Sequence, residues 1–145
     1  MNKPVSPERY LEEHGSLTWR NTGTSMLPLL KEGRDLFTVT KKGSGRCRKG
    51  DVVLYRRGKQ LVLHRVVEVR EKDYVILGDG CVRRETGVTD DDILGVMTSF
   101  VRRGREHRTD EPGYRLYTRL WMAAAPLRIS LQKAAHRLRR TAEKE

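Results

Sequence analysis

Apolar and β-branched residues recur along the middle of this chain in short runs, separated by turns rich in glycine and charge. Runs of this length with many Val, Ile, Leu, Thr and Tyr residues are typical of strands. The pattern predicts strands at 36–40, 51–55, 60–70, 74–77 and 93–101. Because their spacing leaves room mainly for turns, we expect a mainly β, largely antiparallel body.

The two ends of the chain differ from this body. Ser6-Pro7-Glu8 combines an N-cap residue, a first-turn proline and an early acid, which predicts a short helix ending near Gly15. Residues 102–113 are charged and end in Pro112-Gly113, as in a linker, whereas 114–140 are helical in composition with an interruption at Pro126. We therefore expect a helical lead-in (1–19), a β domain (20–101), a charged linker (102–113) and a basic amphipathic helix with its tail (114–145).

Positive charge is concentrated towards the C-terminus. The 145 residues contain 30 Lys and Arg against 19 Asp and Glu, a net charge of +11. Residues 1–100 hold 18 basic and 14 acidic side chains, and residues 101–145 hold 12 and 5. The excess therefore belongs mainly to the tail, which indicates an acidic surface as its partner.

Several protein classes are disfavoured by what the sequence lacks. Cys47 and Cys81 are too few for a disulfide framework and lack metal-ligand spacing, so we expect reduced thiols, no metal and no cofactor. Residues 1–19 carry Glu8, Glu12 and Glu13 without an apolar run, and no window of about 18 uncharged apolar residues occurs. We therefore expect neither a signal peptide nor a transmembrane helix, and a cytoplasmic location.

One stretch suggests chemistry: Gly23-Thr24-Ser25-Met26-Leu27-Pro28-Leu29-Leu30. A small hydroxyl residue stands between a flexible glycine and an apolar run suited to burial. This predicts a serine at the edge of an apolar surface, where a nucleophile has to be. Since Gly-x-Ser combinations are also common in ordinary turns, the prediction depends on partners elsewhere in the chain.

A serine hydroxyl becomes a good nucleophile only when a neighbouring base takes its proton. His14 falls in the predicted N-terminal helix, and His107 and His136 fall in basic segments. Only His64 lies inside an apolar strand, where the alternative is a hydrogen-bonded core histidine. We therefore take His64 as the candidate base.

A catalytic histidine usually needs an acceptor that fixes its tautomer. Asp79, in Gly78-Asp79-Gly80 at the end of the next strand, is the best-placed carboxylate, although a simple turn aspartate is the alternative. Glu85 is a further candidate acid. The run 90–92 of three aspartates also suits a solvated loop or a cap, and we expect residues 83–92 to form an acidic loop.

Taken in chain order, these segments form a recognisable series. It reads Gly23-Thr24-Ser25-Met26-Leu27-Pro28, Gly33-Arg34-Asp35, Lys49-Gly50-Asp51-Val52-Val53, Leu63-His64-Arg65-Val66-Val67, Leu77-Gly78-Asp79 and Ile93-Leu94-Gly95-Val96. The series resembles the superfamily shared by type I signal peptidases and LexA-like self-cleaving repressors, over roughly residues 20–100. The resemblance implies a signal-peptidase/LexA-like β fold in which a Ser-Met turn supplies the nucleophile and the substrate lies extended along a strand.

Histidine at position 64, where bacterial signal peptidases and the repressors have lysine, resembles the archaeal and endoplasmic-reticulum branch. That resemblance implies a serine-type endopeptidase with Ser25 as nucleophile, His64 as general base and Asp79 as the orienting carboxylate. The branch often has a second acid about six residues after its Gly-Asp pair, and Glu85 stands there. Many bacterial relatives keep a hydroxyl where this chain has Gly23, so the oxyanion hole would rest on backbone N–H groups near Ser25, with Thr24 as a helper.

The resemblance also suggests partners. The expected substrate is a precursor or leader peptide, and residues 114–140 place Tyr, Trp and Leu among basic residues, which suits peripheral contact with an anionic membrane. A helix packed on its own domain is the alternative for this segment. Two other functions stay open: an inactive peptide-binding module of the same fold, and a nucleic-acid-binding protein, which is disfavoured because no helix-turn-helix or zinc pattern occurs.

Overall fold

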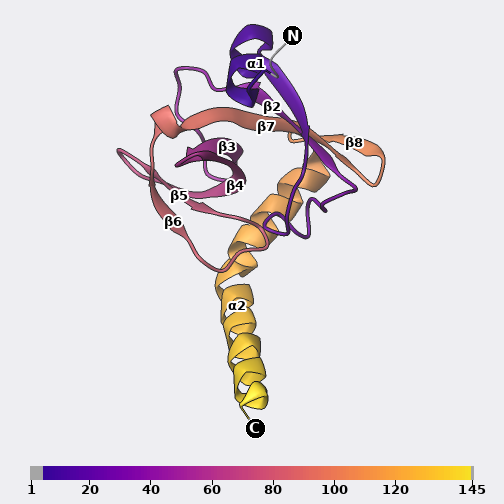
Figure 1. The fold of residues 1–145 in the computed structure, drawn as a ribbon, viewed down its shortest axis with the longest axis vertical. Coiled ribbons are helices and arrows are strands. Elements are labelled where there is room, and N and C mark those ends of the chain that lie inside the picture. The colour runs from indigo at the N-terminus through magenta and orange to yellow at the C-terminus, as the bar shows by residue number, and fades with distance from the viewer. Residues whose placement is uncertain (1–4, 145) are drawn as a thin grey trace.

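The computed structural model describes residues 5–144 and arranges them as one strongly curved antiparallel sheet with a long C-terminal helix projecting from it (Figure 1). The elements in chain order are α1 (Pro7–His14), β1 (Ser16–Arg20), β2 (Leu36–Lys41), β3 (Val52–Arg57), β4 (Gln60–Val69), β5 (Tyr74–Leu77), β6 (Glu85–Val88), the 3-10 turn η1 (Asp90–Asp92), β7 (Ile93–Arg102), β8 (Arg105–Arg108) and α2 (Pro112–Glu143). The expectation of a mainly β body followed by a C-terminal helix is therefore confirmed.

Local sequence accounts for the first elements. The Ser6 side chain accepts a hydrogen bond from the Arg9 N–H, and Gly15 ends α1 in the left-handed conformation with φ of 81°. The chain then enters β1, which pairs with β2 from Ser16 to Arg20. The predicted helix is confirmed, but the lead-in 1–19 also supplies an edge strand of the sheet.

The sheet follows the order β1-β2-β7-β3-β4-β5-β6, with β8 paired to β7. Strand β7 joins the two halves of the sheet because it pairs with β2, β3 and β8 along its ten residues. Two expectations for the connections are wrong. Residues 83–92 include β6, and the expected linker at 102–113 contains β8 and the start of α2. Arg103 and Gly104, with φ of 54° and 78°, form a tight hairpin turn between β7 and β8. The sequence prediction did not include this turn, because it took Pro112-Gly113 as the end of a linker.

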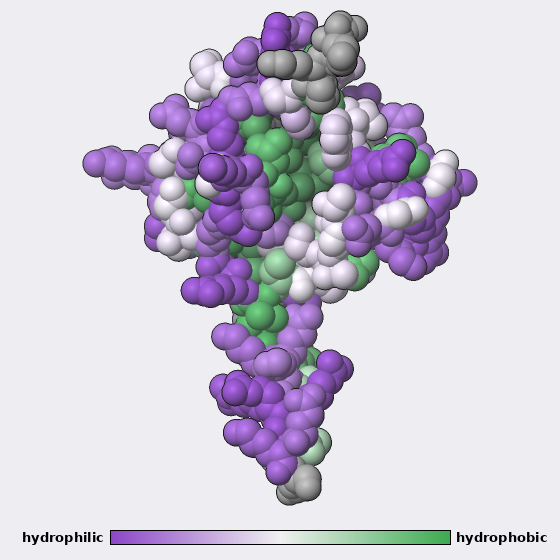
Figure 2. All heavy atoms as spheres, viewed as in Figure 1, coloured by the Kyte–Doolittle hydropathy of each residue, from purple (hydrophilic) through white to green (hydrophobic). Residues whose placement is uncertain are grey.

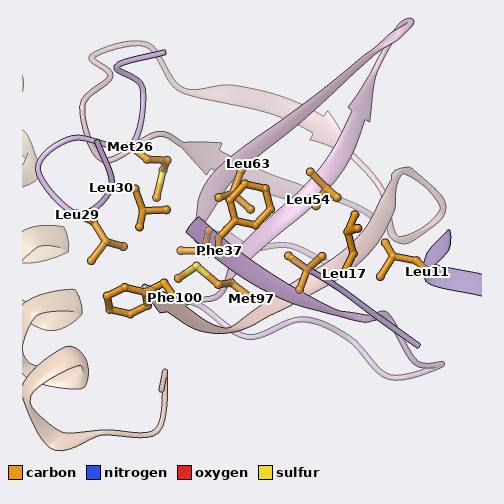
Figure 3. Close-up of a cluster of buried hydrophobic side chains, with 12 residues drawn as sticks. Leu11, Leu17, Met26, Leu29, Leu30, Phe37, Leu54, Leu63, Met97 and Phe100 are labelled. Atoms are coloured by element: carbon orange, nitrogen blue, oxygen red, sulfur yellow. The ribbon is translucent and has the colours of Figure 1, made fainter. Parts of the chain in front are cut away.

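Two clusters of buried side chains fill the body. The larger one includes Leu17, Phe37, Leu63 and Phe100, with further residues from the loop between β1 and β2 (Figure 3). The smaller one includes Tyr55, Tyr74 and Ile76, on strands β3 and β5. Burial of this apolar surface supplies most of the stabilisation of the sheet.

Helix α2 runs without a break through Pro126, so the expected interruption is absent. Its first half lies against the body and its second half projects away from it (Figure 1). The helix is anchored by a buried ion pair between Arg65 of β4 and Asp79, whose side chains are each 1% exposed. Tyr117 donates a hydrogen bond of 2.7 Å to the Asp79 carboxylate, and Arg65 donates one of 3.1 Å to Thr118.

No helix within residues 5–144 has a segment both long and apolar enough to cross a bilayer. Hydrophilic residues cover much of the projecting part of α2 on the face shown in Figure 2, and hydrophobic residues appear near its margin.

The Arg65–Asp79 pair predicts a large loss of stability when one partner is removed. Substitution Arg65→Met leaves a buried carboxylate without its counter-ion and should lower the free energy of unfolding by roughly 3–5 kcal/mol. Arg70→Met removes the solvent-screened pair with Asp73 and should change the free energy of unfolding far less. Urea denaturation of both variants checks this, and equal small losses would contradict the assigned role of the buried pair.

Candidate active site

The loop between β1 and β2 presents Ser25 at the edge of the core. Its neighbour Met26 and the following Leu29 and Leu30 are buried, whereas Ser25 is half-buried. In Figure 3 these three apolar side chains point into the cluster around Phe37 and Leu63. The apolar run therefore anchors the turn and leaves the serine at the surface, as the sequence predicted.

The turn packs directly on the loop that follows β5. The Gly80 N–H donates a hydrogen bond of 2.8 Å to the Ser25 carbonyl oxygen. A Cβ atom added to Gly78 would lie 2.5 Å from that same oxygen and 2.9 Å from His64 Cδ2, and one added to Gly80 would lie 2.6 Å from the Thr24 carbonyl oxygen. Glycine is required at both positions because the two backbones approach too closely for a side chain.

Ser25 and His64 line one cavity of about 1070 Å³. Strand β1 and the loop after β5 form parts of its wall, and its other polar lining residues include Arg20, Asn21, Arg57, Cys81 and Glu85. Within residues 5–144 no hydrogen bond joins Ser25 Oγ to His64; such contacts are often long in free enzymes and tighten when substrate binds. The arrangement brings a hydroxyl and an imidazole to the same cleft.

His64 is oriented by a tyrosine that a carboxylate holds in place. Its Nδ1 lies 3.2 Å from the Tyr55 hydroxyl, and that hydroxyl donates a hydrogen bond of 2.5 Å to Glu85. Arg57 completes the group with a 2.7 Å ion pair to Glu85. The three partners come from β3 and β6, and the strand register sets them on the face of the sheet that carries His64.

The hydrogen bonds of this group determine which nitrogen of His64 carries the proton. Burial and the hydrogen bond to Glu85 raise the pKa of Tyr55, so its hydroxyl keeps its hydrogen. That hydrogen is committed to Glu85, whose own pKa is lowered chiefly by the Arg57 hydrogen bond. The Tyr55 oxygen can then only accept from His64, which puts the proton on Nδ1 and leaves Nε2 with a free lone pair.

Burial also sets the charge of His64. It lowers the pKa of the imidazole to about 4, together with the positive charge of Arg57 and against the opposing charges of Glu85 and Asp79. At neutral pH the ring is therefore uncharged, which is the state able to accept a proton from a serine.

Asp79 does not take the place expected for it. Its two carboxylate oxygens accept hydrogen bonds of 2.7 and 2.8 Å from Arg65, and none joins it to His64 among the described residues. The reason is the two-residue repeat of a strand, which sends the side chains of His64 and Arg65 to opposite faces. Asp79 lies with Arg65 and helix α2, whereas Glu85 is linked to His64 through the Tyr55 hydroxyl.

Two residues of the cleft wall, Ser25 and Asn21, each carry an N–H donor without an acceptor among the described residues. The Ser25 N–H donates to no acceptor within residues 5–144 and is the candidate donor to a substrate. The Asn21 Nδ2 group also has no partner among these residues, but it is buried in a side chain that is only 4% exposed. Thr24, the expected helper, is exposed and is not part of the cleft wall. Asn21 could not be singled out from residue patterns, because a lone asparagine before a turn is common.

Cys81 is a second potential nucleophile in the cleft. A Cβ added to Gly78 would lie 2.7 Å from its sulfur, so the thiol is near both Ser25 and His64. Burial raises the pKa of this thiol, which keeps it protonated and poorly reactive at neutral pH. Among residues 5–144 no group of three or more His, Cys, Asp or Glu side chains is arranged to hold a metal ion.

Comparison with known proteins adds no relative to this picture. No protein-family model matches the chain, and no curated protein matches it. The function is therefore inferred from the residues of the cleft and their geometry.

Proposed function

We propose that this protein is a serine-type endopeptidase of the signal-peptidase kind, which cleaves a precursor or leader peptide with Ser25 as nucleophile and His64 as general base. The observation that supports it most is the shared cleft, in which a half-buried serine meets a neutral histidine whose Nδ1 is held by Tyr55. A curved antiparallel sheet with the serine turn beside an edge strand also agrees with the signal-peptidase/LexA-like fold that the sequence resembles.

In the proposed reaction Ser25 attacks the substrate and His64 moves the protons. Nε2 of His64 takes the proton of Ser25 as the serine oxygen attacks the carbonyl carbon of the scissile bond. The Ser25 N–H stabilises the oxyanion, since this chain has Gly23 where the bacterial relatives have a hydroxyl residue. The imidazolium then protonates the leaving amine, and a water molecule activated by the same histidine releases the acyl group from Ser25.

Glu85 and Tyr55 are positioning residues in this proposal, because they act on the substrate only through His64. A carboxylate bonded directly to the histidine would do the same task in the familiar triad. Here Tyr55 stands between the histidine and the carboxylate of Glu85, and the positive charge of Arg57 partly neutralises that carboxylate. Asp79 holds the loop and helix α2 and thereby supports the serine turn through Gly80.

A probe that acylates active-site nucleophiles tests the nucleophile without knowledge of the substrate. A biotin-tagged β-lactone should modify Ser25 in the intact protein, and peptide mass spectrometry should find the adduct on the tryptic fragment 21–31. Ser25→Ala should abolish this adduct, and His64→Ala should slow it by roughly 10⁴-fold or more, because an unactivated hydroxyl is a poor nucleophile.

Two controls sharpen the test of the nucleophile. Ser44→Ala removes an exposed loop hydroxyl and should leave modification unchanged. Cys81→Ala should likewise leave the Ser25 adduct intact. An adduct found on Cys81 would favour a cysteine nucleophile, and a lack of any His64-dependent adduct would favour the inactive peptide-binding module.

The pH dependence of acylation follows from the pKa of His64. The folded-state pKa of about 4 lies below the value near 6.5 of an unperturbed histidine, so the neutral base persists as the pH falls from 7 towards 5. The acylation rate constant should therefore stay level in this range and be halved near pH 4. Because the unfolded chain binds the proton first, the same shift destabilises the fold as the pH falls from 6.5 to 4. Circular dichroism must accompany each rate, and a midpoint at 6.5 in folded protein would contradict the assignment.

A further inference from the structure

Helix α2 carries a stripe of exposed leucines that no other part of residues 5–144 covers. They are 57% to 72% exposed and follow one another at intervals of four, seven, four and seven residues: Leu116, Leu120, Leu127, Leu131 and Leu138. At 3.6 residues per turn these positions fall within an arc of about 60°. Ala124 and Ala135 occupy adjoining positions in the same repeat. The helix therefore has a narrow, continuous apolar face.

The side of α2 that packs on the body is a different one. Tyr117 and Trp121 hydrogen-bond to Asp79, and Arg128 donates a 2.9 Å hydrogen bond to the Cys81 carbonyl oxygen. The aromatic residues that the sequence suggested for a membrane surface thus serve the body instead. From residue 131 to 144 every residue is exposed, so the end of the helix lies free of the sheet (Figure 1).

Basic side chains border the apolar stripe on both sides. Around the helix, Arg115, Arg119, Lys133, Arg137 and Arg140 lie on one flank, and Arg139 lies on the other, next to Arg128, whose guanidinium contacts the body. No acidic residue occurs between Glu111 and Glu143. A leucine stripe bordered by cationic residues is the pattern of helices that lie in the headgroup region of a bilayer.

We propose that the leucine stripe of α2 and its basic flanks form a peripheral docking surface for an anionic lipid bilayer. The charge pattern favours this occupant over a second copy of the chain, because two such helices side by side would bring rows of like charge together without an acid to pair them. A nucleic acid would meet the charges but leave the leucines in water. An anionic bilayer matches both the basic flanks and the leucine stripe. Its phosphate headgroups attract the arginines, and its acyl boundary buries the leucines.

Docking in this way also orients the cleft. The opposite side of α2 holds the loop from Gly78 to Cys81, which contacts the Ser25 turn. The helix that lies on the lipid therefore also supports the candidate active site. Docking would hold the body, and with it the cleft, in one orientation relative to the bilayer.

Vesicle sedimentation of the full-length protein tests the proposal. Vesicles of phosphatidylcholine with about 30% phosphatidylglycerol should bind the protein at least tenfold more strongly than pure phosphatidylcholine, and added salt should weaken the binding. The double variant Leu131→Ser/Leu138→Ser should lose binding by at least tenfold. Both positions lie beyond the last contact with the body, so the fold is retained. Val69→Ser, a matched exposed apolar position on β4, should bind as the unmodified protein does.

A second pair of variants separates charge from apolar contact. Arg137→Gln/Arg140→Gln should weaken binding to anionic vesicles on the order of tenfold, whereas Arg103→Gln/Arg105→Gln removes the same charge from the β7–β8 hairpin and should have little effect. Equal binding to both lipids, or no loss in the leucine variant, would overturn the proposal. A lipid-free dimer that the leucine variant abolishes would show a second copy as the occupant. Binding to duplex DNA without binding to vesicles would show a nucleic-acid surface.

Discussion

The close contact between the Ser25 turn and the loop Gly78-Asp79-Gly80 is the constraint on which the candidate site depends. The hydrogen bond from the Gly80 N–H to the Ser25 carbonyl oxygen joins two segments far apart in sequence, and neither glycine leaves space for a Cβ. Asp79, between them, is tied to Arg65 and to α2. The Ser25 turn is thus held by Met26, which is packed in the core, and by the loop that α2 supports.

Strand β4 separates two polar groups, although residue types alone suggested that His64 and Asp79 act together. His64 faces Tyr55, Glu85 and Arg57, and its neighbour Arg65 faces Asp79 on the other side of the sheet. The first group fixes the tautomer of a candidate base, and burial keeps that base uncharged at neutral pH. The second is a buried ion pair that fixes the helix. The two acids therefore differ in what they contact. Glu85 is linked to the imidazole through Tyr55, and Asp79 joins β4 to helix α2 through Arg65 and Tyr117.

Local patterns were enough to predict part of this arrangement. The β-branched runs identified the main strands, the Ser6-Pro7 pair identified α1, and the setting of Ser25 and His64 identified two residues that do share a cleft. The Tyr55–Glu85 link could not be predicted, because it forms only when strands distant in sequence come together. The β7–β8 turn could not be predicted because an arginine, Arg103, takes the first of its two positive-φ positions, where glycine, asparagine or aspartate is usual.

The protonation of His64 tests the central claim most directly, because the proposed reaction requires a free lone pair on Nε2. Nitrogen-15 NMR of the imidazole at neutral pH should show a neutral ring with its proton on Nδ1. Tyr55→Phe should abolish that preference, while Tyr74→Phe, which removes a similarly placed hydroxyl bonded to Asp90, should preserve it. A ring protonated on Nε2 in the unmodified protein would contradict the account, since His64 could then not take the proton of Ser25.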